Sequence, residues 1–244
     1  MNRCPLALLV FPLAILAACD VGSVTPGGGD DVPGVDAAIP VDAPIPTFAV
    51  AVDPPAASTS LGTVTSFTVT LTSSHFAGPV TVAATGAPAG WSVEVLPATI
   101  TLGDGGTATA QVKVTVPSNA PAAPAGQDLA ISATAPAYSA SGSAALTVAN
   151  EFTLNIGQAG GGIHFGAMNG GVVRLRAGTL FHIKNDDTGT AHRIHTGGGI
   201  GGFDHQGSDM APGGSYDVTP TGGSDSFYCH DHGQGSGEVN LVIE

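Results

Sequence analysis

The sequence predicts an all-β protein made of two successive β-sandwiches behind a signal and a disordered tether. Among its 244 residues are 36 Gly and 18 Pro, and only 10% of the chain is charged, which favours strands joined by turns over helical bundles or coiled coils. Hydrophobic residues alternate with period two along much of the chain. Seven of the eight histidines follow residue 151, so the two halves differ in chemistry.

The charge balance excludes one class of partner. Six basic residues against 19 acidic ones give a formal net charge of −13. Because phosphate backbones repel so acidic a chain, we expect no binding to nucleic acid. Neutral, basic or metallic partners are expected instead.

The first 19 residues have the plan of a secretory signal, with a positively charged start, an apolar stretch over residues 6–16 and small residues before a cleavage point. The apolar stretch is too short to span a bilayer stably. The segment Leu16-Ala17-Ala18-Cys19 resembles the lipobox of bacterial lipoproteins, which implies cleavage before Cys19 and acylation of its thiol. This anchor would hold the chain on a membrane of the bacterial cell envelope, facing the periplasm or the cell surface. The alternative is an ordinary secretory signal with an incidental cysteine.

Residues 20–46 predict a tether. They are rich in Pro, Gly, Ala and Asp and contain five acidic residues and no basic one. This composition cannot bury enough apolar surface to fold. We expect a disordered linker that lifts the rest of the chain off the membrane.

Residues 47–150 predict the first β-sandwich, with seven or eight short strands in about 100 residues. Apolar and polar residues alternate around Phe67 and around Val112, and similar runs lie near 79–85, 91–102, 127–135 and 141–149. The stretch 87–93 and the strands after it resemble the Ig-like modules of bacterial surface and secreted proteins. Trp91 is expected in the core, as large aromatic residues fill sandwich interiors. Nothing in this segment indicates chemistry.

Residues 151–244 place many imidazoles near Cys229, the one thiol that would be neither removed with the signal nor acylated. Such a set is typical of a soft-metal site. An incidental buried cysteine is the alternative. The closing alternation of Val239, Leu241 and Ile243 predicts a strand with a buried face.

Strand alternation selects among the histidines. In residues 191–195, Ile194 must face the core, so His192 faces inward with it while Arg193 and His195 point outward. In residues 226–229, an inward Phe227 turns Cys229 inward as well. His192 and Cys229 are therefore expected on the core side.

Three stretches of this half together resemble the cupredoxins, the small blue copper proteins: Arg176-Ala177-Gly178-Thr179 leading to Asn185-Asp186-Asp187 and His192; Met210-Ala211-Pro212-Gly213-Gly214-Ser215-Tyr216; and Phe227-Tyr228-Cys229-His230-Asp231-His232 before Gly237-Glu238-Val239. The resemblance covers about residues 151–244. It implies a Greek-key β-sandwich holding one type 1 copper ion. The ligands that it implies are His192, Cys229 and His232, a His2Cys set that suits both oxidation states of copper.

The sequence departs from the cupredoxin pattern in two places. Gly235 stands where the family usually has a weak axial methionine, and Gln234 is the nearest replacement as axial ligand. Arg193 follows the first histidine, where many relatives have an asparagine that helps to fix the ligand loops. Met210 is expected in the core.

Three further histidines lie near the predicted ligand loops. His195 and His230 could be alternative ligands, a second weak metal site or a solvent-facing rim, and the rim is favoured. His205, with Asp204 and Asp209 nearby, is expected over the same end of the sandwich. If these outward side chains cluster, copper could also be taken up or handed on through them.

The remaining histidines are not expected to bind metal. His164 and Met168 occupy a Gly-rich stretch and are expected to be loop residues rather than ligands. His182 alternates with Phe181 and Ile183, so it should face outward.

The sequence therefore predicts a lipid-anchored blue copper protein that carries single electrons between redox partners. We find no catalytic motif and expect no enzyme. The acidic surface favours a basic redox partner, such as a cytochrome-like protein. The alternatives are a carrier or store that holds and delivers Cu(I), and a surface scaffold without metal.

Overall fold

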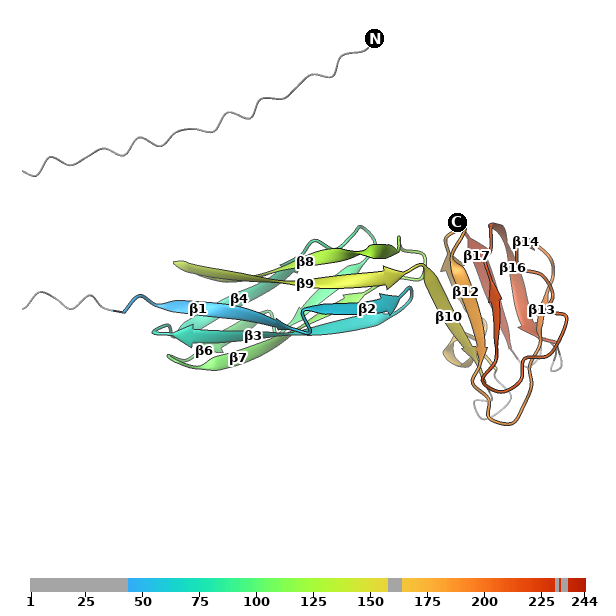
Figure 1. Cartoon of the computed structure of the whole chain (residues 1–244), viewed down its shortest axis with the longest axis horizontal. Coiled ribbons are helices and arrows are strands. Elements are labelled where there is room, and N and C mark those ends of the chain that lie inside the picture. The colour runs from blue at the N-terminus through green and yellow to red at the C-terminus, as the bar shows by residue number, and fades with distance from the viewer. Residues whose placement is uncertain (1–43, 158–163, 231–232, 234–236) are drawn as a thin grey trace, which may run out of the picture. The chain divides into compact units, whose positions relative to one another are not determined.

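A computed structural model describes residues 44–157, 164–230, 233 and 237–244 (Figure 1). The predicted signal, Cys19 and most of the predicted tether lie outside these residues. Within the described part, the only helical element is the short 3-10 helix η1 (Gly166–Met168). No helix among those residues is long and apolar enough to cross a membrane.

The first sandwich consists of two sheets with a common hydrophobic core. The four-stranded sheet has the order β1 (Thr47–Asp53), β3 (Val64–Ser74), β7 (Thr107–Thr115), β5 (Ser92–Leu96). The five-stranded sheet has the order β2 (Ala56–Ser60), β9 (Tyr138–Ala149), β8 (Ala123–Ala135), β4 (Gly78–Thr85), β6 (Thr99–Leu102). Both sheets contribute alternate residues to the core, including Phe67, Val112 and Leu146, each with no exposed surface.

Strand alternation predicted most of these elements, and one of them wrongly. Trp91 lies in the core with 8% of its surface exposed, as expected. The apolar run at 91–102, however, is not one strand. It forms β5 and β6, which are separated by Pro97 and Ala98 and belong to different sheets, and the sandwich has nine strands rather than seven or eight.

The second sandwich also consists of two sheets. One has the order β10 (Glu151–Ile156), β12 (Leu180–Asn185), β15 (Ser215–Val218). The other has the order β11 (Val172–Leu175), β17 (Glu238–Ile243), β16 (Gly222–Cys229), β13 (Ile194–Thr196), and β14 (Ile200–Gly201) also pairs with β16. The pairs β10–β12 and β11–β17 are parallel, and the others are antiparallel.

The chain of the second sandwich passes repeatedly from one sheet to the other, because β10, β12 and β15 alternate along the sequence with strands of the second sheet. Aromatic residues join the two sheets across the core: the ring centroids of Phe181 on β12 and Phe227 on β16 lie 6.0 Å apart. Val239, Leu241 and Ile243 face this core, as predicted. The predicted fold class, all-β with two successive β-sandwiches, is confirmed for the described residues.

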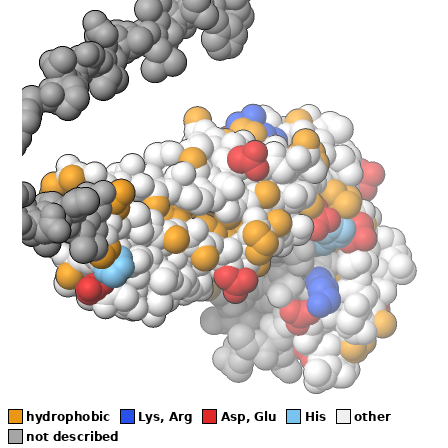
Figure 2. Space-filling model, turned by 60° about the vertical axis from the view of Figure 1, so that its left-hand side comes forward, with side chains coloured by type: hydrophobic (Ala, Val, Ile, Leu, Met, Phe, Trp, Pro, Cys, Tyr) orange, Lys and Arg blue, Asp and Glu red, His pale blue; other side chains and the backbone are white. Residues whose placement is uncertain are grey.

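Charged side chains are sparse on the described surface. On the face drawn in Figure 2, acidic and basic residues are scattered singly among neutral ones, and hydrophobic side chains form small separate spots. Scattered apolar residues of this kind are normal for a protein surface. On this face, the acidic side chains are therefore dispersed rather than gathered in one block.

Candidate metal centre

Two of the predicted ligands meet in the interior of the second sandwich. His192 lies between β12 and β13, and Cys229 is the last residue of β16. Neither residue has any exposed surface, as strand alternation predicted. The Nδ1 atom of His192 lies 3.4 Å from the Sγ atom of Cys229. Imidazole nitrogen and thiolate sulfur are the two donor types that copper and zinc accept together.

The backbone around His192 is fixed by an antiparallel bridge to Met210. The N–H group of His192 donates to the carbonyl of Met210 at 3.0 Å, and the N–H group of Met210 donates back at 2.6 Å. Met210 is itself 3% exposed and belongs to the core, as expected. On the other side, Ile194 pairs in register with Cys229. Strand pairing therefore sets the approach of the two candidate ligands.

The second nitrogen of the His192 ring faces a carboxylate. Its Nε2 lies 3.5 Å from Oδ2 of Asp187. The N–H group of Gly189 donates to Oδ1 of Asp187 at 3.1 Å, and this bond, reinforced by His192, holds the pKa of Asp187 below its ordinary value despite the opposing effect of desolvation. An ionised Asp187 would favour a proton on Nε2, which leaves Nδ1 as the nitrogen available to a metal.

Asn185 organises the loop that carries Asp187 and His192. Its side chain is fully buried, and its Nδ2 donates to the carbonyls of Thr190 at 2.9 Å and Met210 at 3.0 Å. Its Oδ1 accepts the N–H group of Asp187 at 2.9 Å. One side chain thus ties the loop to the segment opposite His192. The sequence showed Asn185 only as part of the stretch before His192 and did not predict this function.

A third imidazole lies beside His192. His164 is 2% exposed, and its ring centroid is 5.0 Å from that of His192 in an edge-to-face arrangement. Sequence reasoning treated His164 as an ordinary loop residue. It does lie in a turn, but its side chain is buried against His192. The one sequence signal was the adjoining Phe165, which is 3% exposed and packs edge-to-face on Phe227.

His232 and the proposed axial residue Gln234 lie outside the described residues, as does Cys19. Gly233, which lies between His232 and Gln234 in the sequence, donates its N–H group to the carbonyl of Cys229 at 3.0 Å.

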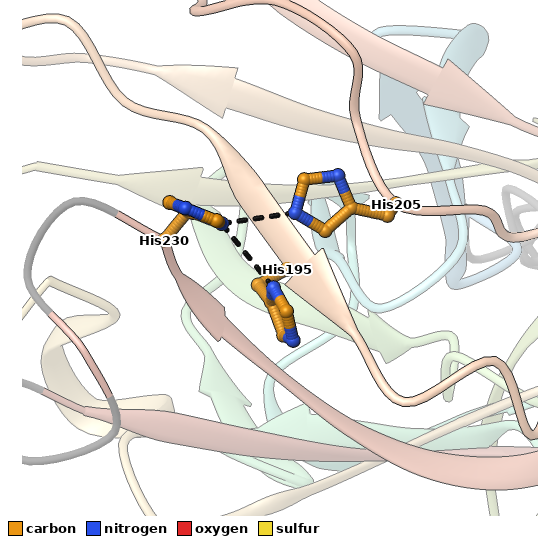
Figure 3. A group of neighbouring side chains, drawn as sticks. All are labelled: His195, His205 and His230. Carbon is orange, nitrogen blue, oxygen red and sulfur yellow. Dashed lines mark hydrogen bonds between the residues drawn. The ribbon is translucent and has the colours of Figure 1, made fainter.

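A second group of histidines lies on the outside of the same strands (Figure 3). His195 comes from β13, His230 directly follows β16, and His205 comes from the segment between β14 and β15. Their ligand atoms all lie within 4.8 Å of one another. His195 points outward, as predicted, and its ring contacts His230 and Tyr228. Burial and the two neighbouring imidazoles lower the pKa of His195.

The remaining side chains of interest have structural partners. His182 faces outward, as predicted, with its Nδ1 2.8 Å from Oδ1 of Asp217 and its Nε2 3.6 Å from Oε2 of Glu151. Arg193 pairs with Asp209 at 3.4 Å. Met168 ends η1, half-buried against the core.

The comparisons with known proteins add a general likeness. No family model and no curated protein matches the chain. Among solved structures, the chain is similar to a mutant of amicyanin in its reduced Cu(I) form, at 16% identity over 38% of this chain and 82% of that one, with a TM-score of 0.29. It is also similar to titin domain M7, at 14% identity over 43% of this chain and 98% of that one, with a TM-score of 0.25. Likeness at this level says nothing about a site.

Proposed function

We propose that the second sandwich binds one copper ion through His192, Cys229 and His232 and that the protein carries single electrons in the bacterial cell envelope. The observation behind this proposal is the 3.4 Å approach of Nδ1 of His192 to Sγ of Cys229, both fully buried. A copper ion bound there would alternate between Cu(I) and Cu(II), which supplies the one-electron chemistry.

The residues present fit such an ion. A buried imidazole and a buried thiol face each other, and the donor set, completed by a second imidazole, is the one typical of blue copper centres. A free thiol in an oxidising compartment is liable to oxidation or to pairing between molecules, and a bound metal protects it. The carboxylate of Asp187 lies at the far nitrogen of His192, where metal-binding histidines commonly have such a partner.

The surrounding chain holds its ligands in place. Asn185 and the bridge to Met210 fix the backbone of His192, and the pairing of β13 with β16 fixes that of Cys229. Because these anchors are hydrogen bonds to backbone groups in a packed core, the two side chains have little freedom to rearrange. Ligands that stay in place between oxidation states suit electron transfer, since little reorganisation is then needed.

The partner and the anchor belong to the same proposal. Acylation of Cys19 would tether the protein to a membrane. The net charge of −13 favours a basic redox protein, cytochrome-like in charge, as electron donor or acceptor. We assign no catalytic reaction to the chain.

The second candidate is a carrier that holds Cu(I) and delivers it to another protein. It is favoured by the exposed histidines His195, His205 and His230, through which copper could pass. A third possibility is a surface scaffold that binds no metal.

Voltammetry of the copper-loaded full chain tests the electron carrier against these alternatives. The proposal predicts a reversible one-electron wave and copper that stays bound when the reduced protein meets a Cu(I) chelator of matched affinity. Rapid release of Cu(I) to the chelator would favour the carrier. A folded chain that takes up no copper would leave the scaffold.

A further inference from the structure

We propose that His195, His205 and His230 form a second metal site, which takes a late first-row divalent ion such as Zn²⁺ and is independent of the site at Cys229. The three side chains come from separate segments, and their imidazole nitrogens converge on one point (Figure 3). Neutral imidazoles are ligands for zinc, copper and nickel, and they discriminate against calcium and magnesium.

The distances suit a shared ion. Nδ1 of His230 lies 3.2 Å from Nδ1 of His195 and 2.9 Å from Nε2 of His205. Two nitrogens bound tetrahedrally to zinc at 2.0–2.1 Å lie about 3.3 Å apart. All three nitrogens are within 4.8 Å of one another, so small side-chain rotations bring each of them to bonding distance of one ion.

The hydrogen-bonding chemistry of the group favours a metal over a network of imidazoles alone. A single ring nitrogen carries either one proton or one in-plane lone pair. Nδ1 of His230 is nevertheless the common atom of both short contacts, so it cannot make two good hydrogen bonds there. An ion at the centre would accept a lone pair from each of the three nitrogens.

The site is open to solvent. His205 and His230 are exposed, and His195 is half-buried with its ring against Tyr228, at a centroid distance of 4.7 Å. An ion can therefore enter without any rearrangement of the core. The acidity of the chain as a whole further favours a cation.

The two sites lie on opposite faces of one strand pair. His195 pairs in register with Tyr228 and faces outward, whereas the adjacent pair, Ile194 and Cys229, is fully buried. Binding at the outer face therefore needs no thiol. For this reason the inference does not rest on the proposed copper function, and each can fail without the other.

The test is calorimetric titration with Zn²⁺ of the full chain carrying Cys229→Ser. The variants His195→Ala, His205→Ala and His75→Asn are made in this Cys229→Ser chain and titrated in the same way. His75 is an exposed histidine of the first sandwich with φ of 57°, a conformation that asparagine tolerates, so His75→Asn is the matched control. We expect one binding event that persists in the control. It should weaken by at least about 100-fold in either cluster variant, since even the loss of an outer partner costs about 10–100-fold in metal affinity.

Chemical modification of histidine, mapped by mass spectrometry, gives a second readout that needs no cluster variant. Zn²⁺ should protect His195, His205 and His230 from diethylpyrocarbonate and leave His75 reactive. The inference would be overturned if both cluster variants bound Zn²⁺ as tightly as the parent chain and Zn²⁺ protected none of the three histidines. The three residues would then be an exposed rim of imidazoles.

Discussion

The side chain of His192 is positioned at both of its ring nitrogens. Nδ1 faces Sγ of Cys229 at 3.4 Å, and Nε2 faces Oδ2 of Asp187 at 3.5 Å. A ring held in this way presents one defined nitrogen to a metal, because a carboxylate partner favours a proton on the other. The orientation of His192 thus depends on a residue that would not itself be a ligand.

Asp187→Asn should weaken copper binding by about 10–100-fold, the usual effect of losing a carboxylate partner of a metal-binding histidine. The amide keeps an oxygen for the N–H group of Gly189 but removes the negative charge beside Nε2. Competition with a chelator of known copper affinity measures the change. The matched control is Asp186→Asn, which alters an adjacent carboxylate that pairs with Lys184. Equal affinities in the two variants would show that Asp187 does not position His192.

The connection between β12 and β13 depends on one buried amide. Asn185→Ala should lower the free energy of unfolding of the second sandwich by about 3 kcal/mol, because the carbonyls of Thr190 and Met210 each lose a hydrogen bond and the N–H group of Asp187 loses its acceptor. Peptide-resolved hydrogen exchange over β12 and β16 measures the loss. Asn155→Ala, at an exposed position of β10, is the control and should have little effect. Comparable exchange in both variants would contradict this function of Asn185.

The pairing of β12 with β15 carries a pH-dependent contribution. The hydrogen bond with His182 lowers the pKa of Asp217 below its ordinary value. A carboxyl with a depressed folded-state pKa contributes stability above its unfolded pKa and loses it as pH falls through the folded value. Asp217→Asn should therefore lower the thermal midpoint at pH 6, by an amount equivalent to less than about 1 kcal/mol for so exposed a pair, and leave it nearly unchanged near pH 2. An equal difference at both pH values would contradict this assignment.

The sequence could predict those features of the strands that depend on burial alone. Ile194 and Phe227 must face the core, and this determines the inward direction of His192 and Cys229 without further information. The alternation at 91–102, in contrast, does not reveal that β5 and β6 belong to different sheets. Strand membership is decided by pairing with distant segments, which a local pattern does not contain.

In the candidate site, too, some features follow from local alternation and others from contacts between distant segments. The contact of His164 with His192 joins positions far apart in the chain and follows from how the sandwich closes. The outward direction of His195 was predictable from alternation. Its convergence with His205 and His230 was not, because it depends on the pairing of β13 with β16 and on the path of the segment between β14 and β15. Sequence reasoning could therefore only offer a second metal site as one of several alternatives.

At the scale of the whole molecule, the proposal includes a membrane anchor. Cys19→Ser should shift the protein from the membrane fraction to the soluble fraction of a bacterial host, because the acylated thiol is the proposed attachment. Cys4→Ser, in the segment that would be removed, is the matched control and should remain with the membrane. Fractionation with a lipid-labelling assay measures both. Unchanged membrane association and labelling of the Cys19 variant would contradict the anchor.

The central claim, a copper ion on His192 and Cys229, is tested most directly by the visible absorption of the full chain with Cu(II). Wild type should turn intensely blue through thiolate-to-copper charge transfer at one equivalent of copper, as blue copper centres do. Cys229→Ser and His192→Ala should lose that band while circular dichroism shows an unchanged sandwich, and His75→Asn should keep it. A folded wild-type chain without the band, or a Cys229→Ser variant that retains it, would contradict the account.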